Sequence, residues 1–210
     1  MSVLSRDEIT RRLKLSVEEA QSIVITPLLF KEEEFDHDAV DLRLGCYFRL
    51  PAISSVPCIR PYREEGIDHY PELMYKPYPR RLGGHPDENT KEDLAARSEL
   101  ILQPQHAVLA STLEYIKIPG DVSAEILTKS SWARVFISIA SAPWIHPFYR
   151  GCLTLEIANL GNIPVALPVG EPIAQLVFMT VEPHEEISED VIEGTYAGAI
   201  MPEAPRFPHR

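Results

Sequence analysis

The chain has 210 residues, of which 45% are hydrophobic, so it can bury one sizeable core and is expected to form a single domain, 1–210. Its formal net charge of −11 argues against nucleic-acid binding, because no long stripe of lysine and arginine is present to neutralise phosphates. No apolar run approaches the ~18 residues of a membrane span, and three cysteines without a CxxC pair predict reduced thiols in the cytoplasm.

The first predicted elements are a short helix and two strands. Ser5 stands three residues before Glu8, which is the spacing of a capping box and predicts a helix over about residues 6–13. The segment SIVITPLLF reads as a strand that ends at its proline. A second strand, residues 39–50, contains Gly45, which marks a bulge or a close approach of two strands.

Residues 51–99 have a different character, rich in charge, proline and glycine and without a sustained period. A loop of this length is either functional or mobile, and a surface excursion is the simpler interpretation. The segment is therefore predicted to be a long loop insertion.

Short strands return from residue 100 onward, separated by turn signals such as Pro119-Gly120. The 19 prolines favour short strands, because proline excludes long helices and central strands. This spacing predicts a mainly β protein, either a barrel or a jelly-roll-like sandwich. The proline-rich tail, 196–210, lacks a core pattern and is predicted to be mobile or ordered only on docking.

Metal and nucleotide-fold signatures are missing. The seven histidines form no HxH or HExxH pattern, and the HxE…PCxxC signature of zinc nucleobase deaminases does not occur. P-loop and dinucleotide-binding motifs do not occur either. No protein metal site, and in particular no zinc, is expected.

The segment TKSSWAR combines two hydroxyls, Ser130 and Ser131, with two cations, Lys129 and Arg134. Hydroxyls, backbone N–H groups and a guanidinium within one turn suit phosphate oxygens. The alternative is a polar turn with an N-cap serine.

The segment WIHPFYRGCLTLEIAN, residues 144–159, alternates strictly in its second half. Leu153, Leu155 and Ile157 point to one side of the predicted strand, and Glu156 points to the other. Glu156 is either a solvated residue on the wet face of a sheet or a catalytic base in a pocket.

Gln175 lies within the apolar strand of VGEPIAQLVF. An amide in a buried strand must find hydrogen-bond partners. These partners are either structural or belong to a ligand or a neighbouring subunit.

Six segments, taken in order, resemble the dCTP deaminase branch of the dUTPase superfamily. TKSSWAR is similar to the family's G-R-S-S-x-x-R, and the strand with Glu156 is similar to its I-D-P-G-[FW]-x-G-x-[IL]-x-L-E-x-x-N. The six segments are VLSRDEITRRL, AVDLRLGCYFRL, LQPQHAVLASTLEYIKIPGDVSAEI, TKSSWAR, WIHPFYRGCLTLEIAN and VGEPIAQLVF.

The resemblance implies a distorted, jelly-roll-like β-barrel of the dUTPase type with a short N-terminal helix. It also implies a homotrimer whose active sites lie between subunits. The implied reaction is hydrolytic deamination of dCTP to dUTP and ammonia in the supply of dUMP and dTTP. The resemblance involves no zinc, and Mg²⁺ is expected to arrive with the nucleotide triphosphate.

The resemblance also assigns roles to residues of this chain. Glu156 would activate the attacking water, Arg134 would position the water and the pyrimidine, and Ser130 would contact the catalytic water and phosphate oxygens. Tyr149 would stack below the deoxyribose. The remaining implied substrate-binding positions are Lys129, Ser131, Ser141, Ala142, His146, Gln175 and Tyr196.

Several positions depart from the family pattern. His146 replaces the aspartate of I-D-P-G, which argues against dUTPase activity and against direct formation of dUMP. Phe148 replaces the following glycine, and Lys129 replaces an arginine. In the tail, Thr195 and Ala199 replace a lysine and a glutamine that reach the triphosphate in the family. A non-catalytic trimeric homologue used for binding or regulation, and dUTPase-type pyrophosphate hydrolysis, therefore remain as alternatives.

Overall fold

The structure is a computed structural model whose described residues are separated by gaps. The described ranges are 2–28, 38–51, 99–139, 142–182 and 198–203, together with the backbone of a short strand at 75–77. Most of the predicted insertion, 51–99, therefore lies outside the described residues.

Strands dominate the described chain, as the proline and turn spacing predicted. Helix α1 spans Arg6–Leu13, and a single helical turn, α4, spans Ser130–Ala133. The strands are β1 (Val24–Thr26), β2 (Val40–Pro51), β3 (Tyr75–Pro77), β4 (Glu99–Leu102), β5 (Ala107–Lys117), β6 (Val122–Thr128), β7 (Ile137–Ile139), β8 (Trp144–Ile145), β9 (Arg150–Asn159), β10 (Val165–Pro168) and β11 (Pro172–Thr180).

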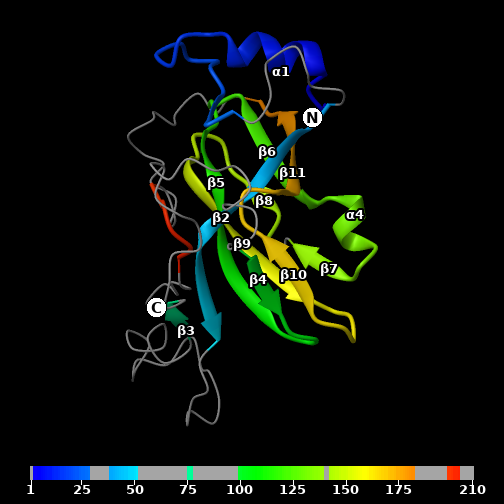
Figure 1. The fold of residues 1–210 in the computed structure, drawn as a ribbon. Helices are drawn as coiled ribbons and strands as arrows, with labels where there is room; N and C mark the ends of the chain where they lie inside the picture. The colour runs from blue at the N-terminus through cyan, green and yellow to red at the C-terminus, as the bar shows by residue number, and fades with distance from the viewer. Residues whose placement is uncertain are drawn as a thin grey trace, which may run out of the picture.

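The strands form one large, curled antiparallel sheet and one small sheet (Figure 1). The large sheet has the order β7-β9-β5-β2-β11-β6-β8, with β1 added beside β5 and β3 beside β2. The small sheet pairs β10 with β4. This arrangement confirms the predicted mainly β, barrel-like fold.

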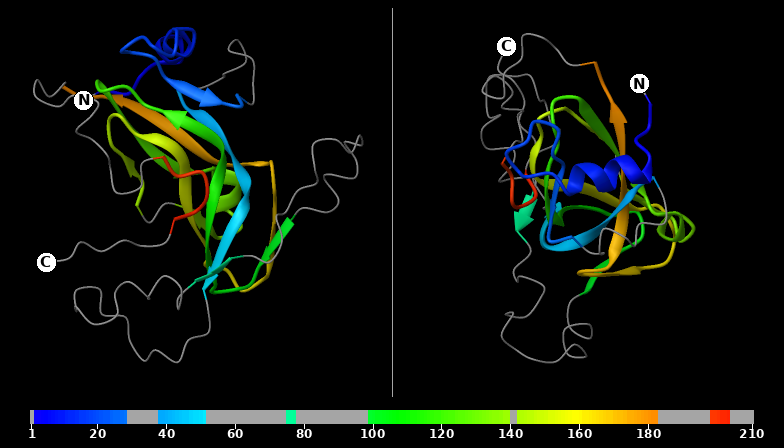
Figure 2. Two further views of the ribbon diagram at one scale, coloured as in Figure 1. Left: turned by 90° about the vertical axis from the view of Figure 1, so that its left-hand side faces the viewer. Right: turned by 90° about the horizontal axis from the view of Figure 1, so that it is seen from above.

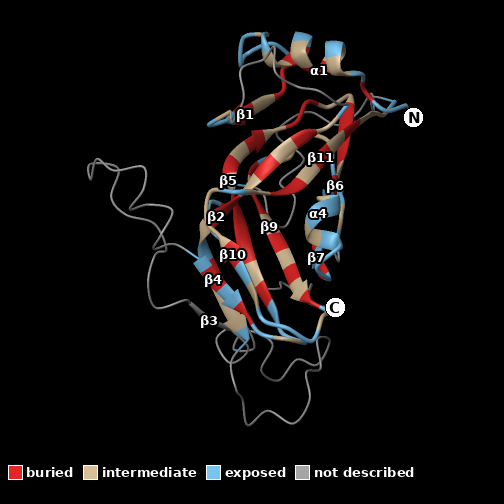
Figure 3. Ribbon diagram, turned by 45° about the vertical axis from the view of Figure 1, so that its right-hand side comes forward, coloured by how far each residue is buried: buried red, intermediate tan, exposed pale blue. Residues whose placement is uncertain are grey.

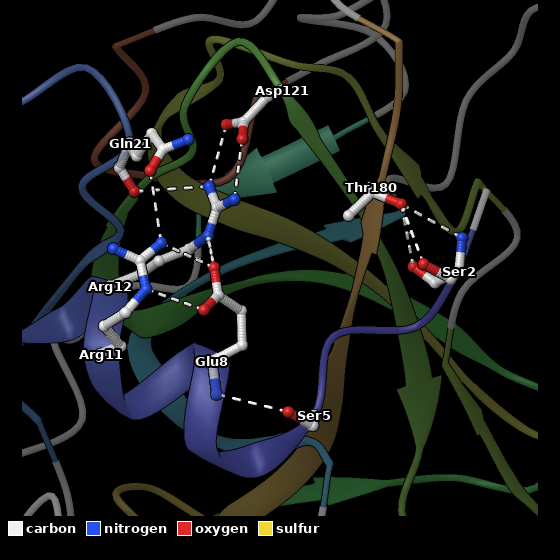
Figure 4. Close-up of polar contacts among 8 residues, drawn as sticks. All are labelled: Ser2, Ser5, Glu8, Arg11, Arg12, Gln21, Asp121 and Thr180. Carbon is white, nitrogen blue, oxygen red and sulfur yellow. Dashed lines mark hydrogen bonds and ion pairs between the residues drawn. The ribbon is translucent and has the colours of Figure 1, made fainter.

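Helix α1 lies across one end of the curled sheet (Figure 2). The Ser5 hydroxyl accepts a hydrogen bond from the Glu8 backbone N–H at 3.4 Å, so the capping position predicted from the sequence is confirmed. Arg12 anchors the helix, because its guanidinium donates to both carboxylate oxygens of Asp121 at 2.9 and 2.7 Å (Figure 4).

The core fills the inside of the curled sheet, and alternate residues are buried in strands such as β4 and β9 (Figure 3). Along β9 the buried and half-buried positions alternate without interruption from Gly151 to Asn159, which confirms the period-two prediction for this segment. The largest fully buried side chains are Phe178, Ile9, Ile23, Leu42, Leu44, Ile116, Ile118, Ile137, Leu155, Ile157, Leu167 and Ile173.

Gly45 lies where β2 approaches β5 most closely. The pairing of the two strands shifts register between Leu44 and Phe48, and a Cβ at Gly45 would lie 2.7 Å from the Ser111 carbonyl oxygen. A side chain at Gly45 would therefore force β2 and β5 apart. Of the two predicted alternatives, the close approach is confirmed, and the pairing is irregular at the same place.

Arg43 and Glu114 form an ion pair across the same two strands. Arg43 Nε donates to Glu114 Oε1 at 2.6 Å, and the Arg43 backbone N–H donates to Oε2 at 2.9 Å. Glu114 is fully buried, so these bonds compensate for the removal of its charge from water.

Across the described chain, no helix has both the length and the apolar character needed to cross a membrane.

Candidate active site

Glu156 extends from the outer face of β9. Its neighbours Leu155 and Ile157 point into the core and are 1% and 0% exposed, whereas Glu156 is half-buried. The strand is held on one side by β5, where Leu109 lies opposite Glu156, and on the other by β7. Glu156 is therefore fixed on a rigid element, with its carboxylate directed away from the core.

One oxygen of the Glu156 carboxylate has a defined partner. The backbone N–H of Ala142 donates to Oε2 at 3.1 Å. Ala142 follows β7, which pairs with β9 through Ile139 and Ile157, so this bond depends on the β7–β9 pairing. It orients the carboxylate, and Oε1 has no hydrogen-bond partner among the described residues.

Asn159, the asparagine of the L-E-x-x-N pattern, has a structural role. Its amide donates to the Leu102 and Ile163 carbonyls at 3.0 and 2.9 Å, and its Oδ1 accepts from the Gly161 N–H at 2.9 Å. Asn159 is fully buried, so these three bonds satisfy its polar atoms. They fasten the end of β9 to β4 and to the following turn, and so stabilise the strand that carries Glu156.

The second part of the site is the α4 segment, residues 129–134. Thr128, at the end of β6, is bonded to Ile139 in β7: its hydroxyl donates to the Ile139 carbonyl at 3.1 Å and accepts from the Ile139 N–H at 2.8 Å. These bonds join the two strands that the α4 segment connects. Trp132 Nε1 donates to the Pro172 carbonyl at 2.9 Å, which attaches the segment to β11. The α4 segment is thus a short connection between β6 and β7 that is held by hydrogen bonds where the two strands meet and to β11.

Ser130, Ser131 and Arg134 are exposed. The ribbon of α4 is coloured mainly as exposed in Figure 3. Within the described part of the chain, none of the three makes a side-chain hydrogen bond or ion pair. Lys129 differs, because its ammonium contacts Asp41 Oδ2. The segment therefore offers two hydroxyls and one guanidinium to an anion in solution.

Glu156 and the α4 segment are not joined to each other in this chain. Among the hydrogen bonds and ion pairs of described residues, none connects Glu156 with Ser130, Ser131 or Arg134. The predicted catalytic residues thus form two groups without a hydrogen bond between them, and both border β7.

Two residues just before β9, His146 and Phe148, differ from the family pattern, and the structure explains the second of them. Phe148 has a φ of 64°, in the left-handed region that favours the glycine of the family pattern. Its ring fills a notch at Gly120, where an added Cβ would lie 2.2 Å from Phe148 Cζ. Phe148 therefore packs inside its own chain. His146, two residues earlier, is exposed.

Tyr149 is half-buried and packs against the core. Its hydroxyl donates to the Cys152 carbonyl at 2.9 Å. Burial, followed by the nearby Cys152, raises the pKa of Tyr149 well above its usual range. The hydroxyl is therefore engaged within the chain, so only the ring is left for the predicted stacking on deoxyribose.

The described part of the tail, residues 198–203, lies against β9. The Cys152 N–H donates to the Ala199 carbonyl at 2.7 Å, and Ala199 is only 6% exposed. Gly151 permits this approach, because its φ is 144° and a Cβ there would lie 2.9 Å from the Ala199 oxygen. The position where the family has a glutamine is therefore buried against its own chain.

Two further bonds hold this part of the tail. The Glu203 N–H donates to the Thr154 hydroxyl at 3.1 Å, and Arg49 Nε donates to the Pro202 carbonyl at 2.6 Å. Residues 198–203 lie on the opposite side of the molecule from α4 (Figures 1 and 2). The predicted site residues Ser141 and Tyr196, like the departure at Thr195, lie outside the described residues.

Gln175 finds a structural partner, since its amide donates to Asp41 Oδ1 at 3.2 Å. Asp41 was not among the residues singled out in the sequence, although it stands in the quoted segment AVDLRLG. The only available signal was a charged residue within an otherwise apolar, alternating strand. Glu114 was missed in the same way.

No metal site is evident in the described ranges, where no group of three or more His, Cys, Asp and Glu side chains could hold an ion. The polar groups that remain for a ligand are hydroxyls, a guanidinium and a carboxylate. This set can bind phosphate oxygens at the α4 segment and move a proton at Glu156.

Comparison with known proteins shows the family to which this chain belongs. The profile of a family described as dCTP deaminase-like matches residues 3–181. The chain belongs to this family. Among relatives of this dCTP deaminase-like protein, the dUMP-forming dCTP deaminase of Methanobrevibacter smithii is 32% identical over 188 residues, which cover 89% of this chain and 84% of the relative. The dCTP deaminase of Natronomonas pharaonis is 32% identical over 207 residues, covering 98% and 94%.

A solved structure supports the fold of this dCTP deaminase-like protein. The 2′-deoxycytidine 5′-triphosphate deaminase of Agrobacterium tumefaciens superimposes with a TM-score of 0.54 at 20% identity. The match covers 86% of this chain but only 48% of that structure, so this chain spans about half the length of the solved protein. The family resemblance and the dUTPase-type fold are thus both confirmed.

Proposed function

We propose that this protein catalyses the hydrolytic deamination of dCTP to dUTP and ammonia. The observation that carries the proposal is Glu156, a half-buried carboxylate on a rigid strand with one oxygen held by the Ala142 N–H. Several relatives that are about one third identical are named dCTP deaminases. A fixed carboxylate with a free oxygen suits a reaction that needs one group to accept and then return a proton.

In the proposed mechanism, Glu156 accepts a proton from a water molecule, and the hydroxide attacks C4 of cytosine. Glu156 delivers this proton to N3 of the ring, where it stays. The remaining proton of the new C4 hydroxyl then passes through Glu156 to the exocyclic amine, which leaves as ammonia while the C4 carbonyl forms. Atoms balance, since dCTP and one water give dUTP and ammonia. The Arg134 guanidinium would position the water and the pyrimidine, and Ser130 would contact the water.

The α4 segment would bind the triphosphate through Ser130, Ser131 and Arg134, all of which are exposed. We propose that Mg²⁺ enters as part of the nucleotide substrate rather than through protein ligands. Tyr149 would present its ring to the deoxyribose, and Gln175, His146 and Tyr196 would complete the substrate contacts.

We also propose that the active site is assembled between subunits of a homotrimer. Within one chain, no hydrogen bond or ion pair between described residues joins Glu156 to the α4 segment, and the resemblance of both segments to the family motifs carries this proposal. In an oligomer, the α4 segment of one subunit would face Glu156 of another.

Direct formation of dUMP is a second candidate, because the Methanobrevibacter smithii relative is named dUMP-forming. That activity requires water to attack a phosphorus atom as well as C4. His146 stands where the family has an aspartate, so the chain lacks a carboxylate there. Deamination alone is the function that these residues support best.

The test is an assay of the purified protein with dCTP, CTP, dCMP and dUTP in the presence of Mg²⁺, following ammonia and pyrophosphate separately. Ammonia released from dCTP without pyrophosphate supports the proposal. Glu156→Gln should lower the rate by about 10²–10⁴-fold. Glu125→Gln is the matched control, since Glu125 is also a half-buried strand glutamate and its loss should leave the rate unchanged.

Two other results would change the assignment. Pyrophosphate release from dUTP would favour the dUMP-forming activity and show that the aspartate is dispensable. Absence of both turnover and binding for every pyrimidine nucleotide would favour a non-catalytic homologue.

A further inference from the structure

Three polar side chains meet where β2, β11 and the end of β6 lie side by side. The Lys129 ammonium contacts Asp41 Oδ2, and Gln175 Nε2 donates to Asp41 Oδ1 at 3.2 Å. Asp41 and Gln175 are cross-strand partners, so the register of the sheet brings them together. The side chains of Lys129 and Asp41 are 24% and 19% exposed, which makes them a largely buried ion pair.

The pairing divides the cations of the α4 segment into two kinds. The charge of Lys129 is balanced by Asp41, whereas Arg134 has no side-chain partner among the described residues. An anion that approaches Ser130 and Ser131 therefore meets one net positive charge rather than two. Asp41 reduces the attraction for each additional phosphate, because the energy grows with the charge of the ligand.

We propose that Asp41 is a specificity-determining residue, which neutralises Lys129 and so reduces the preference of the α4 segment for triphosphates over monophosphates. The inference rests on the proposed function, in which this segment binds the phosphates of a deoxycytidine nucleotide. It predicts that the protein discriminates weakly between dCTP and dCMP. Gln175 fixes the Asp41 carboxylate and therefore acts as a positioning residue for the pair.

The first test compares Asp41→Asn with the wild-type protein. Asparagine keeps the shape of the side chain and a hydrogen-bonding oxygen but removes the charge. Dissociation constants are measured by calorimetry at fixed ionic strength for dCTP, dCMP, inorganic tripolyphosphate and inorganic phosphate. Glu99→Gln, which removes one exposed negative charge elsewhere, is the control.

Asp41→Asn should lower the dissociation constants of dCTP and tripolyphosphate about fivefold to tenfold. It should change those of dCMP and inorganic phosphate less than about twofold. Glu99→Gln should leave the ratio between triphosphate and monophosphate binding unchanged. An unchanged ratio in Asp41→Asn, or weaker binding of tripolyphosphate, would overturn the proposal.

A second variant tests whether the effect passes through Lys129. Asp41→Asn combined with Lys129→Met replaces the ion pair by two neutral side chains, so the double variant should bind tripolyphosphate within about twofold of the wild-type protein. A double variant that binds tripolyphosphate as tightly as Asp41→Asn alone would show that the released ammonium is not responsible and would contradict the inference.

A single variant keeps the inference testable if Asp41→Asn does not fold. Lys129→Met leaves the Asp41 carboxylate unbalanced beside Arg134, so it should weaken the binding of tripolyphosphate about fivefold to tenfold and that of inorganic phosphate less than about twofold. Equal losses for the two ligands would refute the proposal. If the wild-type protein binds tripolyphosphate as predicted but releases no ammonia from dCTP, the proposed function fails while the role of Asp41 stands.

Discussion

The arginines of helix α1 and the arginine of the α4 segment have opposite surroundings. Arg12 is 4% exposed and donates to both Asp121 and Glu8, and Arg11 donates to both oxygens of Glu8 (Figure 4). Arg134 is exposed and makes no side-chain ion pair or hydrogen bond with another described residue.

This difference separates a structural cluster from a binding surface. In the α1 cluster, formed by Glu8, Arg11, Arg12 and Asp121, every charge already has a partner within the chain, so a ligand would have to break bonds in order to bind. In the α4 segment, the hydroxyls and the guanidinium can bind a ligand without breaking bonds to described residues. Stability is therefore expected to depend on the first group and function on the second.

The largest expected effect is the loss of Arg12. Arg12→Ala should lower the free energy of unfolding by about 3 kcal/mol, because Asp121 would lose the guanidinium that binds both of its oxygens and Glu8 would lose one of its two arginine partners. Chemical denaturation measures the change. Arg11→Ala, at an exposed position with an ion pair to the same Glu8, should lower the free energy of unfolding clearly less than Arg12→Ala, because water screens the exposed pair. Equal losses would show that burial does not distinguish the two arginines.

The next effect concerns activity. Arg134→Ala should reduce ammonia release from dCTP about 100-fold, with a melting temperature within error of the wild type, because the side chain is exposed and stabilises nothing inside the described chain. Arg134→Lys keeps the charge but loses the planar guanidinium, so its rate of ammonia release should lie between those of the wild type and Arg134→Ala. A large drop in melting temperature for Arg134→Ala would assign the residue to the structure.

Two phenylalanines with left-handed backbone extend the same contrast. Phe136, just after the α4 segment, has a φ of 63° and is 64% exposed, whereas Phe148 packs its ring on Gly120. Phe136→Gly should therefore raise the free energy of unfolding by up to about 1 kcal/mol by relieving backbone strain. Phe148→Gly should lower it by about 2 kcal/mol, because the lost ring packing outweighs the relief. The two changes are compared by thermal and chemical denaturation, and a loss of stability in both would refute the role of strain.

The smallest effect is a dependence of stability on acid. Hydrogen bonds from Arg11 and then Arg12 lower the pKa of Glu8 from its usual 4.5 to about 2. A depressed carboxylate pKa stabilises the folded state above about pH 4.5, and this contribution is lost as the pH falls from there through about 2. Glu8→Gln should flatten the stability profile in this window. Glu18→Gln, at an exposed position, should leave the profile unchanged.

Local patterns were sufficient for much of the fold. The Ser5–Glu8 spacing predicted the start of α1, and the alternation of Leu153, Leu155 and Ile157 predicted β9, because both depend on short-range geometry. The spacing of turns and prolines predicted a curled, mainly β fold. The pairing order of the strands was out of reach, since β5 has β2 and β9 as neighbours although both lie far from it in the sequence.

The residues of the candidate site could be listed from the sequence, but their partners could not. The motif around Glu156 predicted a base, whereas the bond from Ala142 depends on how β7 leaves the sheet. The two cations of TKSSWAR looked equivalent, yet only Lys129 is paired, because Asp41 comes from a strand almost ninety residues earlier. Phe148 looked like an obstruction at a glycine position, and the notch at Gly120 shows where its ring goes.

The sequence by itself determined where the short helix lies and that the rest of the described chain is mainly strands, because periodicity and turn chemistry act over a few residues. It also carried the family, since motifs in order are a one-dimensional property. Only the tertiary structure decided which charges are balanced: Arg12 by Asp121, Lys129 by Asp41 and Arg43 by Glu114. Each of these pairs joins segments that are distant in the chain, and burial decides how strongly each charge depends on its partner.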